Sequence, residues 1–246
     1  MASVASQLIL HPVASRALKL LNTTLGRDKL YRAVQYFARF LAWFLLSREY
    51  KIEAARWNAL KSHLALARKL LRLGKPLENL QAVLRALQTS GESGEQITTI
   101  GRHLGYFGYL TLDTLVWANA VKFFNLKPST AEKVNKNANR FWFAGILFSI
   151  THSLLKAGRL ANEIKKLQSS GSWGEKGAET DRDMKLQALR SAREATRYQF
   201  TLDMLDVWLP AANIGLVNFN DGILGLCGLI TSLMALRQQW IAVSKN

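Results

Sequence analysis

The chain has 246 residues, of which 49% are hydrophobic and 20% are charged, so composition alone fits a globular protein as well as a membrane protein. Its net charge of +16 predicts binding to a polyanion, either a nucleic acid or an anionic membrane surface. Residues 1–90 contain fifteen Lys or Arg against four Asp or Glu, a net charge of +11. Because Cys227 is the only cysteine, an intramolecular disulfide and a thiolate metal cluster are excluded.

The pattern along the chain predicts an all-α protein of five to seven helices. Prolines are few, glycine clusters at Gly91–Gly94 and Gly171–Gly177 predict loops, and no strand-like alternation bounded by turn signals is present. The first nineteen residues lack a long apolar run followed by a small-residue cleavage site. We therefore expect no cleaved secretory signal and a post-translational route to a membrane.

Two helices are predicted near the N-terminus. Pro12 suits the first turn of a short helix that ends near Leu21, and a second helix is predicted from Asp28 to Leu46. Apolar residues of the second helix recur at helical spacing, whereas Arg32 and Arg39 share another side. These apolar residues are Leu30, Val34, Phe37, Leu41 and Phe44. The many aromatic rings here fit either a helical core or contact with a membrane.

Residues 54–75, AARWNALKSHLALARKLLRLGK, form a basic amphipathic helix in projection. We expect it to lie in the plane of the membrane interface, with cations at lipid headgroups and leucines at the acyl boundary. The expected cationic face consists of Lys61, Arg68, Lys69, Arg72 and Lys75. The expected membrane-inserting apolar face consists of Trp57, Leu60, Leu64, Leu66, Leu70, Leu71 and Leu73. The alternative is a surface helix of a soluble bundle with a solvated basic face.

Three later segments favour a membrane protein. Residues 101–124 are apolar nearly all round, with Asp113 as the only acid, and residues 141–155 contain no charge. From Val207 to Leu236 only Asp221 is charged, and the portion from about Gly222 onward is the best candidate for a span. A fully buried core helix is the alternative, because Asn213, Asn218, Asn220 and Asp221 are costly in lipid.

We divide the chain into four regions: a basic amphipathic membrane-binding region (1–90), membrane-associated helices (97–160), a polar basic loop and helix (161–200), and a C-terminal hydrophobic or transmembrane helix (201–246). The predicted fold is thus a helical integral membrane protein with N-terminal amphipathic helices and C-terminal hydrophobic helices.

The sequence offers no catalytic, cofactor-binding or metal-binding motif. GESG lacks the spacing of a nucleophile elbow, and the four histidines have no ligand spacing. Asp203 and Asp206 lie three residues apart, which we interpret as a polar contact within the membrane or at a helix entry rather than a catalytic dyad. No zinc finger, RNP motif or basic zipper supports nucleic-acid binding. We expect neither an enzyme nor a nucleic-acid partner.

The quoted residues resemble those of the peroxin-eleven family of peroxisomal membrane proteins over nearly the whole chain, in a fungal-type form. The most specific match is TTLGRDKLYRAVQYFARFLAW at residues 23–43, followed by RKLLRLGK at residues 68–75. Further matches are GYLTLDTLVWANAVKF at residues 108–123 and the Asp, Pro and Gly positions of residues 203–228. Ala67 stands where the family pattern has a serine, which bears on regulation there.

This resemblance implies a role in peroxisome proliferation at the peroxisomal membrane, with both termini in the cytosol. The amphipathic helix would insert into the cytosolic leaflet of an anionic phospholipid membrane, and the protein would self-associate and elongate the membrane. A dynamin-related fission GTPase with its membrane adaptor would then act as partners, and a peroxisomal membrane-protein import receptor would deliver the chain. Candidates for self-association are the small residues Gly101, Gly105, Gly222, Gly225 and Gly228, beside the aromatic second helix.

Two other functions remain open at this stage. A peroxisomal membrane pore for small metabolites is a second role proposed for the family, and it requires polar residues along a path through the bilayer. The candidates for such a path are Asp113, Asn119, His152, Asn213, Asn218 and Asp221. The third possibility is a soluble basic helical adaptor, which alkaline carbonate would extract from membranes.

Overall fold

The computed structural model describes residues 7, 9–89, 91–169 and 176–245. These residues form helices joined by short connections, without β-strands among them, which confirms the all-α prediction. The helices are α2 (Pro12–Leu21), α3 (Thr24–Ser47), α4 (Lys51–Leu70), α5 (Lys75–Gln88), α6 (Ser93–Ala120), α7 (Pro128–Ser169), α8 (Lys176–Asp206), α9 (Trp208–Asn213) and α10 (Asp221–Lys245).

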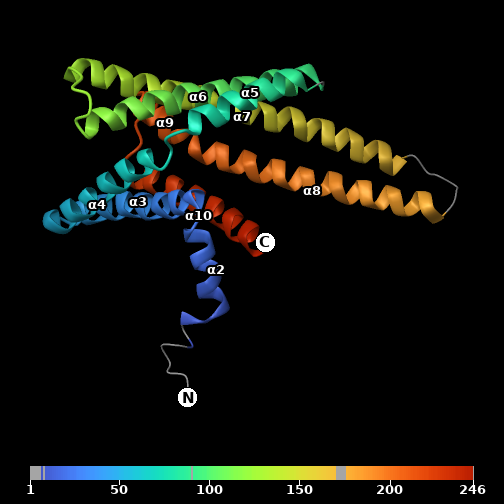
Figure 1. The fold of residues 1–246 in the computed structure, drawn as a ribbon, viewed down its shortest axis with the longest axis horizontal. Coiled ribbons are helices and arrows are strands. Elements are labelled where there is room, and N and C mark those ends of the chain that lie inside the picture. Colours follow the sequence, from blue (N-terminus) through green and yellow to red (C-terminus); the bar gives the residue numbers. More distant parts are fainter. Residues whose placement is uncertain (1–6, 8, 90, 170–175, 246) are drawn as a thin grey trace.

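The helices are arranged in two layers (Figure 1). One layer contains α5, α6 and α7, and the other contains α3, α4 and α10, with α9 between them. The C-terminal half of α7 and most of α8 extend beyond the layers as a long antiparallel arm. α7 runs through the expected regional boundary at residue 160, and α3 packs against α10 from the other end of the chain.

The ends of the predicted helices have identifiable causes. Pro12 stands at the start of α2, and the Thr23 hydroxyl accepts a hydrogen bond from the Gly26 amide at 3.0 Å, which caps α3. α4 ends at Leu70, before the end of the predicted segment 54–75, and Gly74 adopts a φ of 84° that permits the sharp entry into α5. Gly91 lies in the predicted connection before α6, whereas residues 171–175 of the second predicted loop lie outside the described residues.

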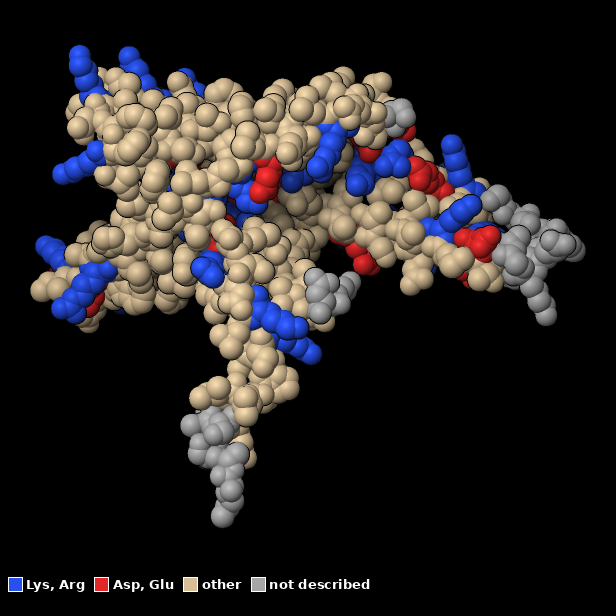
Figure 2. Space-filling model, viewed as in Figure 1, with Lys and Arg blue, Asp and Glu red and all other residues tan. Residues whose placement is uncertain are grey.

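Large apolar side chains are concentrated on the outside of the protein. The outward set includes Phe37 and Phe44 on α3, Phe148 on α7, and Ile230 and Leu233 on α10. Figure 2 shows broad uncharged surfaces over both layers, with charged residues at their edges, in the gap between them and along the arm. Large exposed apolar surfaces on a monomer mark contact with a membrane or another protein.

The buried residues are small or polar to an unusual degree. Arg32 and Arg68 on α3 and α4, Asp113 on α6 and Asp203 on α8 are buried, and the fully buried positions include Ser149. Soluble proteins almost never bury Lys, Arg, Asp or Glu without a partner, and membrane proteins turn such residues toward the bundle interior. The described bundle thus exposes many large apolar side chains and encloses paired charges next to a small apolar core around Tyr36, Leu209 and Leu224.

α10 has the properties of a membrane-spanning helix. Residues 221–244 have a mean hydropathy of 1.2 in their most apolar part, of which only 22% is buried within the protein. Within the described parts of the chain, this is the one helix that is long and apolar enough to cross a bilayer. It begins at Asp221, after a non-helical stretch that contains Asn218 and Asn220, so this candidate span starts next to the predicted position near Gly222.

The glycines predicted to mediate self-association instead allow close helix packing within one chain. Each of the following contacts would be closer than 3.0 Å if the glycine carried a Cβ atom. Gly222 lies against Trp43, Gly225 against the Phe40 backbone, Gly228 against Tyr36, Gly101 against Phe148, and Gly105 against the Gly145 backbone. These surfaces are occupied within one chain in this conformation, and self-association through these glycines stays a prediction.

We predict that Gly225→Ala destabilises the protein. A Cβ at Gly225 would lie 2.8 Å from the backbone nitrogen of Phe40, which cannot rotate away, so the cost should be about 1–3 kcal/mol. The matched control is Gly158→Ala in α7, where the new methyl group meets no atom within 4 Å. That control should be neutral or stabilising by up to ~1 kcal/mol. Chemical unfolding in micelles, followed by circular dichroism, measures both, and equal stabilities would contradict the α3–α10 packing.

Candidate functional site: a polar cavity between the helical layers

A cavity of about 600 Å³ lies between the two layers. Its walls come from α3, α4, α6, α7, α8, α9 and α10, so it is built from nearly the whole chain. Lys and Arg dominate the lining, with seven cations against four aspartates. The cations are Lys29, Arg32, Arg39, Arg68, Lys69, Arg72 and Arg102, and the acids are Asp28, Asp113, Asp203 and Asp206. The formal charge of the lining is therefore +3.

α3 and α4 are joined by a buried ion pair at one wall of the cavity. The Arg68 guanidinium donates from Nε to Asp28 at 3.0 Å and from Nη1 to the amide oxygen of Gln35 at 2.7 Å. Arg68 and Asp28 are both buried. Because removing two charges from water costs several kcal/mol each, the pair requires these additional hydrogen bonds to persist.

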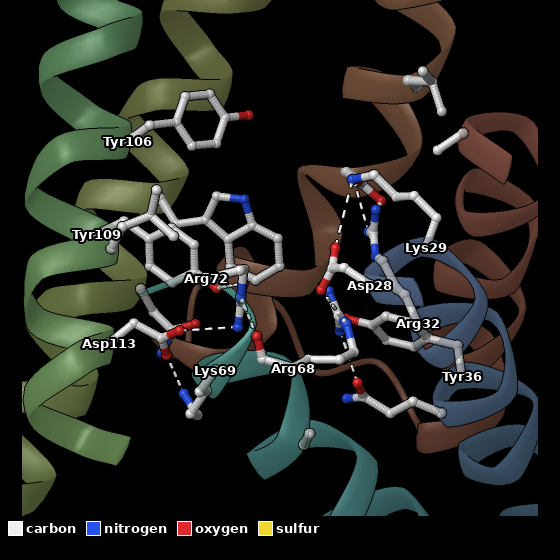
Figure 3. A pocket seen from close by; sticks show the side chains of 18 of the residues that line it. Asp28, Lys29, Arg32, Tyr36, Arg68, Lys69, Arg72, Tyr106, Tyr109 and Asp113 are labelled. Carbon is white, nitrogen blue, oxygen red and sulfur yellow. Dashed lines mark hydrogen bonds and ion pairs between the residues drawn. The ribbon is translucent and has the colours of Figure 1, made fainter. Parts of the chain in front are cut away.

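Asp113 connects the two layers across the cavity. It accepts hydrogen bonds from Lys69 and from Arg72 Nη2, the latter at 2.9 Å, and Arg72 Nη1 donates to the Tyr109 hydroxyl at 2.9 Å (Figure 3). Asp113 is 4% exposed, and the side chains of Lys69 and Arg72 are mostly covered. The end of α4 is thus held to α6 by polar contacts at an interface where the layers otherwise touch little.

α8 supplies two aspartates to the opposite part of the cavity. Asp206 accepts two hydrogen bonds from Arg32, at 2.7 and 2.8 Å, and one from the Thr231 hydroxyl at 2.6 Å. Asp203 accepts hydrogen bonds from Ser149 at 2.5 Å and from Gln199 at 2.9 Å. The interpretation of these acids as polar contacts rather than a catalytic dyad agrees with these partners.

Arg102 on α6 differs from the other cavity arginines. It has no ion pair among the described residues within 4.0 Å, and its buried Nε atom has no hydrogen-bond partner there. Its guanidinium carbon lies 6.0 Å from the centre of the Tyr106 ring, at the limit of a cation–π contact. A guanidinium on the cavity wall therefore keeps unused hydrogen-bonding capacity.

The excess of positive charge affects the protonation of Lys29. Burial, together with repulsion from Arg32, lowers the pKa of Lys29 from its ordinary 10.5 to about 8, although Asp28 lies 3.8 Å away and opposes the change. Burial alone would raise the pKa of Asp28, but Arg68 and the other nearby cations lower it below its ordinary value. Asp28 thus remains ionised, whereas burial raises the pKa of Asp203, although Ser149, Arg102 and Gln199 oppose that change.

The structure places most of the expected cationic face in this cavity rather than on the surface. Arg68, Lys69 and Arg72 turn inward to Asp28 and Asp113, whereas Lys61 lies 3.8 Å from Asp221 and Lys75 pairs with Glu78. In this conformation the three inward cations are engaged by acids of the same chain, and their contact with lipid headgroups stays a prediction. The physical reason is that acids in otherwise apolar helices require partners, and α4 is the segment that provides them.

The expected apolar face lies partly outward. Leu60, Leu70 and Leu73 are 38%, 50% and 41% exposed. Trp57 contacts Phe37 of α3 edge to face, with ring centres 5.9 Å apart. The other members, Leu64, Leu66 and Leu71, are half-buried. Three leucines of the seven expected residues thus remain well exposed for contact with lipid.

The residues proposed as a pore lining are only partly brought together. Asp113 and Asn213 line the cavity, and Asn213 donates to Asn139 at 2.8 Å. The others are placed elsewhere: Asn119 accepts from the Leu126 amide, His152 lies beside Thr98 and Thr99, Asp221 pairs with Arg39, and Asn218 is exposed.

The sequence reasoning missed several cavity residues. Asp28, Lys29, Arg32 and Arg102 were not assigned to a site, although Arg32 and Arg39 were placed on a shared side of their helix. The available signal was that charged residues interrupt heavily apolar segments, where charges mark function. Among the described residues, His, Cys, Asp and Glu form no group of three that could hold a metal ion.

Comparisons with known proteins identify the family of this chain. The family model described as Peroxisomal biogenesis factor 11 (PEX11) matches residues 14–240, which is most of the chain. The chain belongs to the PEX11 family. The resemblance noted in the sequence is thereby confirmed, and the family is that of peroxisomal membrane proteins involved in peroxisome biogenesis.

Relatives cover nearly the full length. Peroxisomal membrane protein PMP30B of Candida boidinii is 31% identical over 97% of this chain and 98% of its own. Peroxisomal membrane protein PMP27 of Saccharomyces cerevisiae is 25% identical over 97% and 99%, and the human Peroxisomal membrane protein 11B is 26% identical over 86% and 91%. No solved structure matches the chain. The names of these relatives support a location in the peroxisomal membrane.

We predict that Asp113→Asn destabilises the contact between the two layers. The substitution leaves Lys69 and Arg72 largely covered without a counter-charge, which should cost about 3 kcal/mol. Glu78→Gln is the control, because its pair with Lys75 lies at the surface and should contribute less than ~1 kcal/mol. Urea unfolding in micelles measures both changes. Similar losses for the two variants would contradict a structural role of Asp113 between the layers.

We also predict a pH dependence that arises from Lys29. Between pH 8 and about 10.5 the folded protein binds fewer protons at Lys29 than the unfolded chain, so this residue makes stability rise with pH across that window. At pH 7 the buried charge is unfavourable, and Lys29→Met should raise the free energy of unfolding there. The difference between the wild-type and Lys29→Met unfolding curves should shrink as the pH increases from 7 to 10. A difference that does not vary with pH would disprove this assignment.

Proposed function

We propose that the chain shapes the peroxisomal membrane by inserting the outward side of α4 into the cytosolic leaflet, self-associating, and elongating the membrane to promote peroxisome fission and proliferation. The observation that carries this proposal is the reversed polarity of the bundle, with large apolar side chains outside and ion pairs inside. Such a protein is adapted to an apolar environment. Material added to one leaflet expands it relative to the other, and positive curvature follows.

The arrangement of α4 modifies how insertion would occur. Leu60 and Leu70 on α4 and Leu73 just after it can enter the acyl boundary while Arg68, Lys69 and Arg72 keep their partners inside. Full burial of a leucine contributes about 1.5–3 kcal/mol, and shallow insertion contributes less. Headgroup contacts would then come from cations at the start of α4, where Lys51 and Arg56 are exposed, at about 1 kcal/mol each.

The remaining parts of the proposal concern partners and orientation. We propose that both termini face the cytosol, that copies of the chain associate with one another, and that a dynamin-related fission GTPase with its membrane adaptor completes division. A peroxisomal membrane-protein import receptor would deliver the chain. Charge complementarity supports an anionic phospholipid surface, because the chain carries a net +16.

We predict that Leu60→Glu combined with Leu70→Glu abolishes membrane tubulation by the full-length protein. Both substitutions place a charge where the side chain would enter the acyl boundary, which strongly opposes insertion. The protein is reconstituted into anionic liposomes and tubules are counted by electron microscopy at low and moderate salt.

The matched control carries the same added charge at exposed polar positions, Ser62→Glu with Gln81→Glu. This control should retain tubulation at close to the wild-type level. Unchanged tubulation by the leucine variant, with normal incorporation into the liposomes, would eliminate α4 insertion as the mechanism.

A second candidate function is a peroxisomal membrane pore for small metabolites. The observation that favours it is the polar cavity inside an otherwise apolar bundle. Release of an entrapped small solute from the same liposomes separates the two functions. Release that persists in the leucine variant after tubulation is lost would favour the pore.

A further inference from the structure

The cavity between the layers has features of a binding site that the proposed membrane-shaping role does not use. Its lining brings seven cations and four carboxylates from helices far apart in sequence to one polar space of about 600 Å³. Each of the acids Asp28, Asp113 and Asp206 is engaged by at least one of the lining cations. The fourth, Asp203, accepts hydrogen bonds from Ser149 and Gln199. Of the seven cations, Arg39 is paired with Asp221 outside the lining, so a positive excess of two charges remains within the cavity.

Two cations on different walls are poorly compensated. Arg102 on α6 has a buried Nε atom without a hydrogen-bond partner among the described residues. Lys29 on α3 has Asp28 at 3.8 Å and Asp206 farther away, and forms no closer ion pair among the described residues. Figure 3 shows Lys29 and Tyr106, the residue one turn after Arg102, on opposite sides of the cavity. Buried donors without partners and a buried positive excess are costly, and an anion between these walls would relieve both costs.

From this geometry we propose that the cavity binds a small polyanion that carries phosphate groups. A phosphate monoester has about −1.5 to −2 charges at neutral pH, so one phosphate group would balance the +2 that remains after Arg39 pairs with Asp221. Guanidinium groups present planar pairs of donors that suit phosphate oxygens, and the lining includes five arginines. The volume exceeds that of a single carboxylate or halide ion and accommodates such a ligand.

The lowered pKa of Lys29 agrees with this assignment. Without a ligand, the charged form of Lys29 is disfavoured by burial and by the neighbouring Arg32. This is expected of a cavity whose side chains are already positioned to bind an anion. The inference does not rest on membrane insertion by α4, because the exposed leucines of that helix take no part in the cavity. The same chemistry could come from the headgroup of a phosphorylated lipid or from a free phosphorylated molecule.

The test uses the full-length protein in micelles of a neutral detergent, with inorganic pyrophosphate as the probe and a chelator present. Isothermal titration calorimetry should detect saturable binding to the wild type. Arg102→Gln and Lys29→Met, which remove cations from two walls, should each weaken binding about tenfold or more. Arg85→Gln removes the same charge from the exposed side of α5 and should bind within about twofold of the wild type.

Circular dichroism establishes that each variant keeps its helices. If Arg102→Gln does not fold, the binding affinity of Lys29→Met tests the proposal by itself. Equal weakening in all three variants, or no saturable binding by the wild type, would overturn the proposal. A second arm uses nanodiscs of phosphatidylcholine with or without phosphatidylinositol 4-phosphate. Loss of pyrophosphate binding in the presence of that lipid assigns the site to a lipid headgroup, and unchanged binding assigns it to a free phosphorylated molecule.

Discussion

The structure depends on one constraint: charges enclosed by a bundle with an apolar exterior must find their counter-charges within the chain. Asp28, Asp113 and Asp206 lie on three helices, and each is paired with an arginine from a different segment of the chain: Arg68 on α4, Arg72 in the turn after α4, and Arg32 on α3. These pairs specify which helices are neighbours, because a different arrangement would leave a buried charge uncompensated at a cost of several kcal/mol. Apolar packing alone would be less selective, since large apolar side chains mostly lie on the surface that faces away from the cavity.

The same constraint explains which parts of the fold could be predicted from the sequence. Helix periodicity, Pro12 and the unbroken apolar run after Asp221 are local signals, and they predicted α2, most of α3 and a C-terminal helix long and apolar enough to cross a bilayer. The predicted start of the second helix at Asp28 was four residues too late, because α3 begins at Thr24, after the Thr23 cap. The direction in which an amphipathic helix faces is not local. For α4 the pattern showed two faces, but whether the cations meet lipid or protein depended on acids 40 residues away in sequence.

The glycines illustrate a similar limit. The small residues at Gly101, Gly105, Gly222, Gly225 and Gly228 correctly indicated close approach of helices, because only a residue without Cβ permits it. The sequence could not show whether the approaching helix belonged to the same chain or to another copy. The cavity could not be predicted from the sequence either, because Lys29 and Arg102 line one cavity only once α3 and α6 are packed in their separate layers. The sequence thus indicated which glycines allow close packing, but only the tertiary fold shows which helices they contact and which side chains form the cavity.

α7 is too long to be enclosed by the hydrocarbon core of a bilayer. Its 42 residues correspond to about 63 Å at 1.5 Å per residue, roughly twice the thickness of a bilayer's hydrocarbon core. The part that follows residue 155 carries Lys156, Arg159, Lys165 and Lys166 against one acid, and it pairs with α8, whose six cations and six acids balance. An uncharged stretch, residues 141–155, is thus continuous with a charged one, without an intervening proline. With residues 141–155 in a hydrocarbon core about 30 Å thick, the charged end of such a helix lies in the aqueous phase, within reach of water-soluble proteins.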